Sequence, residues 1–152
     1  MSHTPVNHPL RPLYRVLAGL TGLYVLLFGI VGAVETSGTE LFGHPAAYAL
    51  GLRTNLAFAL ISIVAGAVIL VATVIGRNLD YRVHQVAGYA FAAMGILMLA
   101  LLQTDANVLN FSVATCVVSF VISLVLLTAG LYSKVGSAED VTAEESYQSR
   151  RA

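Results

Sequence analysis

Apolar residues gather in four long stretches that contain no charged side chain. They cover residues 16–34, 56–75, 86–102 and 108–131. A helix needs about 20 residues to cross a hydrocarbon core of about 30 Å. Each stretch approaches or exceeds this length, and residues 83–85 can extend the third at its start. The pattern therefore predicts four membrane-spanning α-helices.

Two other interpretations of these stretches are less favourable. Strands in lipid must alternate in polarity and close into a barrel, and the four stretches do not alternate. Arg11 and Arg15 precede the first stretch, as basic residues precede the apolar part of a secretory signal peptide. That part usually spans roughly 7 to 15 residues. The first stretch is longer, so an uncleaved span is the better interpretation.

Composition supports a membrane protein. Hydrophobic residues make up 57% of the chain and charged residues 11%, and the mean hydropathy is +0.80. Soluble domains carry roughly a quarter charged residues. Eight basic and eight acidic residues give a net charge of zero, so charge offers no argument for a nucleic-acid partner.

The basic residues are distributed unevenly among the segments between the stretches. One set of segments, which includes both chain ends, holds Arg11, Arg15, Arg77, Arg82, Lys134, Arg150 and Arg151. The other set, residues 35–55 and 103–107, holds Arg53 alone. Basic residues favour the cytoplasmic side of a membrane. We therefore expect a multi-pass protein of the cell membrane with both termini in the cytoplasm.

The chain divides into three parts. Residues 1–13 form a proline-containing arm that we expect to be cytoplasmic and irregular, residues 14–132 form the transmembrane domain, and residues 133–152 form a polar cytoplasmic tail. The tail has too few apolar residues to bury a core, which predicts disorder. Within the first outer loop, residues 45–51 begin with proline and end with glycine, which suggests a short surface helix.

The stretches also suggest an internal repeat. Gly22 and Gly29 in the first recur as Gly88 and Gly95 in the third with the same spacing of seven, and residues 55–58 correspond to residues 107–110. Both halves begin on the same side of the membrane. The predicted fold is therefore an all-α integral membrane protein, a four-helix bundle built from two parallel helical hairpin repeats.

The asparagines at the heads of the even stretches, the glycines of the odd stretches and the closing residues 126–131 together resemble a known family. It is the family of actinobacterial four-span membrane proteins catalogued as domain of unknown function 4383, and the similarity covers residues 14–132. The family places histidine three residues after each asparagine. Phe58 and Asn110 occupy these positions here, so the resemblance implies a fold without supplying a ligand or an activity.

Small residues mark the expected helix contacts, because close approach of helices in lipid requires them. The candidates are Gly22, Gly29, Gly66, Gly88, Gly95 and Ser119. Ser119 belongs to a polar stripe on the fourth stretch. That stripe faces either the bundle or another protein.

Four polar residues near the outer ends are the candidates for contacts or helix capping: Arg53, Asn55, Asn107 and Asn110. Asn55 and Asn107 precede apolar stretches and are expected to cap them, since asparagine accepts hydrogen bonds from unpaired backbone N–H groups. Arg53 either binds an anionic headgroup, pairs with Asp105, or is simply an exposed charge.

Residues for catalysis, cofactor binding or metal binding are not evident. No histidine lies inside an apolar stretch to bind haem, and no Asp, Glu, Lys or Arg lies there to move protons or ions. The serines lack an acid or base partner in lipid. Cys116 is the single cysteine and is best interpreted as a packing residue.

These observations favour a non-enzymatic protein. We expect a structural or accessory subunit of a larger membrane assembly, such as a respiratory or cell-envelope complex, with membrane lipid and other membrane subunits as partners and without haem or nucleic acid. The alternative is a small transporter or a lipid-binding carrier that uses the outer asparagines and arginine.

Overall fold

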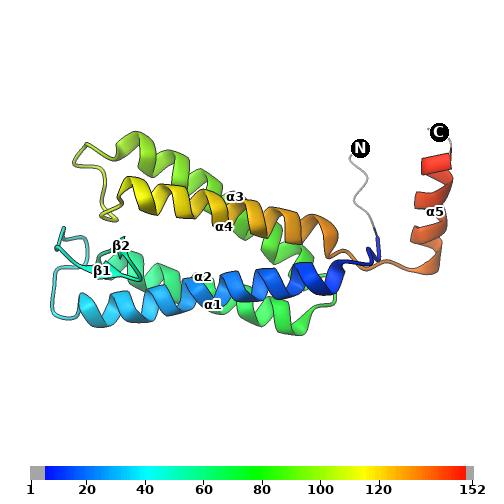
Figure 1. The fold of residues 1–152 in the computed structure, drawn as a ribbon, viewed down its shortest axis with the longest axis horizontal. Coiled ribbons are helices and arrows are strands. Elements are labelled where there is room, and N and C mark those ends of the chain that lie inside the picture. Colours follow the sequence, from blue (N-terminus) through cyan, green and yellow to red (C-terminus); the bar gives the residue numbers. More distant parts are fainter. Residues whose placement is uncertain (1–5, 150–152) are drawn as a thin grey trace.

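The computed structural model describes residues 6–149, and its main body is a bundle of four helices (Figure 1). They are α1 (Arg11–Glu35), α2 (Leu56–Ile75), α3 (Leu79–Leu101) and α4 (Val113–Tyr132). All four are long and apolar enough to cross a membrane. The all-α four-span bundle predicted from the apolar stretches is therefore confirmed.

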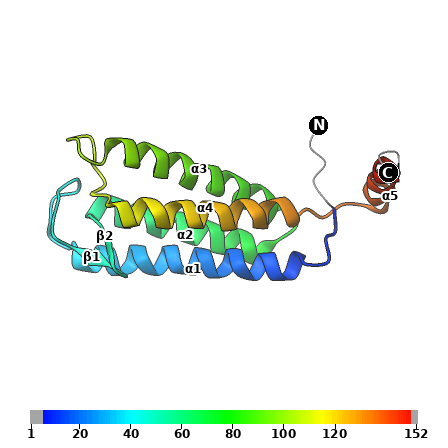
Figure 2. The ribbon, with the colours of Figure 1, turned by 45° about the horizontal axis from the view of Figure 1, so that its top comes forward.

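The helices form two hairpins that pack side by side. α1 packs along α2, α3 packs along α4, and the hairpins meet through α1–α4 and α2–α3 contacts. Figure 2 shows α4 running between α1 and α3. The chain enters and leaves the bundle at one end, which we call the terminal end, and the α1–α2 and α3–α4 loops lie at the other, the loop end (Figure 1). Arg150, Arg151 and the first five residues lie outside the described residues.

Three of the helix starts differ from the apolar stretches by several residues. α1 begins at Arg11, within the arm expected to be irregular, because Pro12 is tolerated in a first turn, where backbone N–H groups have no partner. α3 begins at Leu79, seven residues before the predicted start, and includes charged residues. α4 begins at Val113 rather than at residue 108, with Ser112 as its cap.

The prediction of a short helix over residues 45–51 is wrong. The structure has a hairpin of β1 (Tyr48–Ala49) and β2 (Leu52–Arg53), paired antiparallel. Leu50 and Gly51 form its two-residue turn with φ angles of 46° and 83°. Glycine favours such a turn, and seven residues are too few to sustain a helix alone.

The tail expected to be disordered contains a helix, α5 (Ala138–Ser149), set apart from the bundle (Figures 1 and 2). It begins with a capping interaction in which the Ser137 backbone N–H and hydroxyl donate to Asp140 Oδ2 at 2.8 and 3.0 Å. These hydrogen bonds hold the pKa of Asp140 below its usual value. Capping at this point explains a helix in a polar segment.

The small residues lie where the helices approach each other. A Cβ atom on Gly29 would lie 2.6 Å from Ile63 N of α2, and one on Gly22 2.8 Å from Ile69 Cγ2. Gly66 lies against α1 on the same seam, whereas Gly88 and Gly95 lie against α4. Both hairpins thus have a glycine seam, but close packing requires one in any case, so the internal repeat stays a prediction.

The polar stripe of α4 points into the bundle. Thr115, Ser119 and Ser123 are buried, and Ser119 donates its hydroxyl to Thr115 O at 2.9 Å. Of the two alternatives for this stripe, the structure therefore favours the one in which it faces the bundle.

Candidate functional site

An open polar cleft lies at the loop end, between the α1–α2 loop and the α3–α4 loop. We call it the loop-end cleft; its volume is about 610 Å³, and its polar lining includes His44, Arg53, Gln103, Asp105, Asn110 and Ser112. Three of the four polar candidates from the sequence line the cleft: Arg53, Asn107 and Asn110.

Arg53 carries the unpaired positive charge of the loop-end cleft. Its side chain is partly buried, and its Nε is buried without a hydrogen-bond partner in the part of the chain that the structure describes. Asp105 lines the same cleft, but no ion pair joins the two residues within positions 6–149. A guanidinium group has only donors, so Arg53 lacks acceptors that a ligand can supply.

Asn55 joins the two hairpins in addition to capping α2. Its Oδ1 accepts the Phe58 N–H at 2.9 Å, as expected for a cap. Its Nδ2 donates to Gly43 O at 3.1 Å and to Val108 O at 2.8 Å. The second of these carbonyls belongs to the other hairpin. A role beyond capping was not evident from the sequence.

Asn107 and Asn110 also hold the loops rather than cap α4. Asn107 exchanges hydrogen bonds with the backbone N–H and carbonyl of Phe111, both at 2.9 Å. Asn110 Nδ2 donates to Pro45 O at 3.0 Å and to Thr54 O at 2.9 Å. The cap of α4 is Ser112. The two buried amides are therefore occupied by backbone partners where they line the loop-end cleft.

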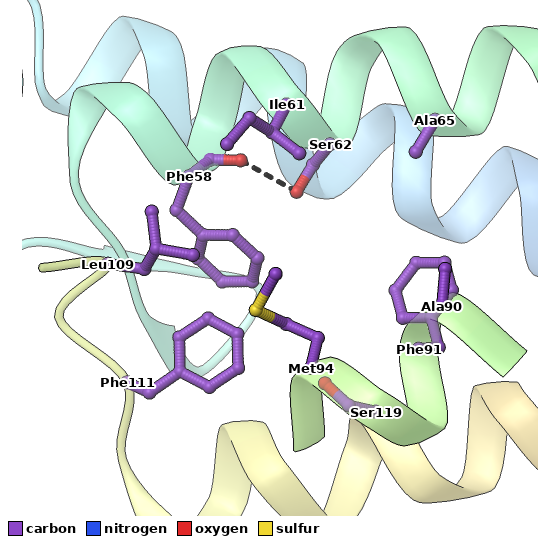
Figure 3. A pocket seen from close by; sticks show the side chains of 10 residues that line it. All are labelled: Phe58, Ile61, Ser62, Ala65, Ala90, Phe91, Met94, Leu109, Phe111 and Ser119. Carbon is purple, nitrogen blue, oxygen red and sulfur yellow. Dashed lines mark hydrogen bonds between the residues drawn. The ribbon is translucent and has the colours of Figure 1, made fainter. Parts of the chain in front are cut away.

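A second cavity, the lateral crevice, lies between α2 and α3 (Figure 3). Its volume is about 120 Å³, and it is lined mostly by apolar side chains, including Phe58, Phe91, Met94 and Phe111. The Ser62 hydroxyl in its wall donates to Phe58 O at 2.8 Å, as the dashed line in Figure 3 shows. Phe111 lines both cavities, so the crevice and the cleft adjoin at this ring.

A buried ionic cluster closes the terminal end. Asp80 is fully buried, and its Oδ2 lies 3.1 Å from Arg11 Nη2 and 3.3 Å from Arg15 Nε. Arg11 Nε also donates to Ser133 O at 2.9 Å, and Arg15 donates to Thr73 O. We call Arg11, Arg15 and Asp80 the terminal cluster. It connects the start of α1, the end of α2, the start of α3 and the residue after α4.

His84 lies one turn beyond Asp80 and is also fully buried. Its Nε2 lies 2.9 Å from Thr73 Oγ1, and that hydroxyl donates to Ile69 O at 2.7 Å. The hydroxyl has one hydrogen, so His84 Nε2 is the donor in their contact. The Nδ1 atom of His84 is buried without a partner among the described residues.

The inward role of Asp80 and His84 was not evident from the sequence, because both precede the apolar part of α3. One signal was present. Asp80, His84 and Gly88 are spaced by four residues, which places them on one face of a helix. That face is the one through which Gly88 packs against α4.

No cluster of three or more His, Cys, Asp or Glu side chains that could hold a metal ion lies within the described residues. Cys116 is buried, as expected for a packing residue.

One protein family matches this chain: the family described as Domain of unknown function (DUF4383), over residues 15–132. The chain belongs to this family. The DUF4383 match covers all of the bundle except the first residues of α1, and it excludes α5. No match was found among curated proteins or among solved structures.

Phe58 and Asn110, at the two positions where the resemblance implies histidine, both make structural contacts in this DUF4383 protein. The Phe58 ring packs against Phe111 with the centroids 4.5 Å apart, in the wall of the lateral crevice. Asn110 connects the α3–α4 loop to the α1–α2 loop. Both residues therefore contribute packing or backbone contacts.

Proposed function

We propose that this DUF4383 protein is a non-enzymatic structural or accessory subunit of a larger membrane assembly, such as a respiratory or cell-envelope complex. The observation that supports this role is the lateral crevice, which leaves an apolar gap between α2 and α3. Ligand pockets usually occupy about 300–1,000 Å³. The crevice is smaller than this range, and its size suits a side chain from a neighbouring helix.

The surface beside the crevice fits a helix partner. Ile61 on α2 and Tyr89 on α3 are 52% and 65% exposed, and Ala90 in the crevice lining is also exposed. Association of helices in lipid depends on van der Waals packing of complementary surfaces. A bulky side chain from a partner helix would fill the crevice, and the flanking apolar residues would pack around it.

The proposal includes the location of the protein. We place it in the cell membrane with both termini in the cytoplasm. The two chain ends and the α2–α3 loop hold seven Lys and Arg residues, whereas the two loops at the loop end hold one.

A photo-crosslinking residue at Ala90 tests the subunit role. The matched control is the same residue at Val71, which is 56% exposed on α2 and does not line the crevice. After irradiation of cells, the Ala90 variant should form a stoichiometric crosslink to one membrane protein, and the Val71 variant should not. Crosslinking to lipid alone from both positions, with a monomer in mild detergent, would contradict the subunit role.

The second candidate is a small transporter or lipid-binding carrier. The observation that favours it is the loop-end cleft, which adjoins an apolar crevice and in which Arg53 has no partner among residues 6–149. Purification in mild detergent separates the candidates, since a stoichiometric protein partner favours the subunit and a bound lipid alone favours the carrier.

A further inference from the structure

The loop-end cleft holds one cation and one carboxylate that do not pair with each other. Arg53 is the single Lys or Arg in residues 35–55 and 103–107. Its backbone is fixed, because it pairs with Tyr48 in the hairpin and lies between buried Leu52 and Thr54. The base of the Arg53 side chain therefore has a defined position at the cleft.

Arg53 lacks an acceptor. Its Nε is buried and unpaired within residues 6–149, so a ligand in the cleft would meet the two Nη groups. Phosphate and carboxylate oxygens satisfy guanidinium groups well, because two parallel N–H groups can contact two oxygens. The first turn of α4 also lies at the cleft, at Ser112 and Val113, and the first N–H groups of a helix favour phosphate.

Asp105 determines which kind of anion fits. Its carboxylate lines the same cleft and would repel a ligand that carries only negative charge. A ligand with a phosphate and an ammonium group can satisfy Arg53 and Asp105 together. The chemistry of the cleft thus matches a zwitterion better than a simple anion.

The surroundings of the cleft favour a lipid as the source of this group. The α1–α2 loop exposes large apolar side chains, with Phe42 55%, Tyr48 56% and Leu50 49% exposed, and aromatic side chains favour the membrane interface. The acyl chains of a lipid can lie against these exposed side chains while its headgroup occupies the cleft.

We propose that the loop-end cleft binds the phosphoethanolamine headgroup of a membrane lipid, with the phosphate at Arg53 and the ammonium group at Asp105. The site is independent of the subunit role, because a subunit and a carrier can both hold a lipid.

Native mass spectrometry of the full chain in mild detergent tests the site. The probes are phosphatidylethanolamine and phosphatidylglycerol, which share the phosphate and differ in the ammonium group. The wild-type protein should bind phosphatidylethanolamine about tenfold more tightly, which corresponds to roughly 1.4 kcal/mol. Equal binding of the two lipids would overturn the proposal.

Substitutions at Arg53 and Asp105 test the phosphate contact and the ammonium contact separately. Arg53→Gln should weaken binding of both lipids by about tenfold, whereas Asp105→Asn should remove the preference for phosphatidylethanolamine. Arg77→Gln, an exposed basic residue at the terminal end, is the matched control and should bind as the wild type does. Unchanged lipid binding by Arg53→Gln would overturn the site. If that variant does not fold, Arg53→Lys should fold and still bind less tightly, because lysine lacks the paired donors.

Soluble O-phosphoethanolamine distinguishes the two sources of the headgroup. It should compete with the lipid weakly, because it lacks the acyl chains that the exposed side chains of the α1–α2 loop would contact. Binding of the soluble compound as tightly as the lipid would overturn the membrane source of the ligand.

Discussion

Asp80 Oδ2 lies 3.1 Å from Arg11 Nη2, and this ion pair connects the start of α3 to the start of α1 across 69 residues of sequence. Asp80 is fully buried, whereas the Arg11 side chain is 21% exposed. The pair therefore stands at the boundary between the packed bundle and the solvent. Its position explains how helices that are not neighbours in sequence keep their ends together.

Replacing Asp80 with Asn should destabilise the bundle. The substitution leaves Arg11 and Arg15 without their shared carboxylate. Breaking a buried ion pair costs about 3–5 kcal/mol, and we expect the lower end of this range because both arginines are partly exposed. The measurement is the free energy of unfolding in detergent. Glu40→Gln, an exposed carboxylate at the loop end, is the control and should change stability little. Equal stability of the two variants would show that the terminal cluster has no structural role.

The apolar stretches predicted the number of helices and the bounds of α2, because burial in lipid requires long uncharged runs. They placed the start of α3 too late, since the first turns contain Asp80 and His84, which have partners on other helices. Such partners are distant in sequence.

The candidate site could likewise be predicted from the sequence only in part. Composition alone singled out Arg53 as the one basic residue of its segments. The role of Asn55 depends on Val108, which a folded loop brings to its Nδ2. Local sequence therefore predicts a cap, and only the three-dimensional structure reveals the connection between hairpins.

Asn55→Asp tests that connection. Aspartate keeps the acceptor that caps α2 but loses the donor to Gly43 O and Val108 O. Two carbonyls would then face a carboxylate oxygen, so we expect a loss of about 1–3 kcal/mol in the free energy of unfolding. Ser112→Asp is the control at the cap of α4, where the residue mainly accepts, and it should be tolerated. If Asn55→Asp were equally stable, Asn55 would act as a cap alone.

Gly29→Ala tests the seam between α1 and α2. The added Cβ would lie 2.6 Å from Ile63 N and 2.7 Å from Ala59 O, which are backbone atoms that cannot move aside independently. Overpacking of this kind costs about 1–3 kcal/mol. Gly19→Ala on the same helix is the control, because its Cβ would lie 3.5 Å from Thr73 Cγ2 in ordinary contact. Thermal unfolding in detergent should show a lower melting temperature for Gly29→Ala alone. Equal melting temperatures of the two variants would show that close packing at Gly29 does not stabilise the bundle.

Membrane orientation can be tested with single cysteines. The chain has one cysteine, Cys116, which is buried, so Cys116→Ser provides the background. Thr39→Cys places an exposed thiol in the α1–α2 loop, and Ser137→Cys places one at the terminal end. Because basic residues favour the cytoplasmic side, a membrane-impermeant maleimide added to intact cells should label Thr39→Cys and should label Ser137→Cys only after permeabilisation. Labelling of Ser137→Cys in intact cells would invert the proposed orientation. It would also place the loop-end cleft, and with it the proposed headgroup site, in the cytoplasmic leaflet.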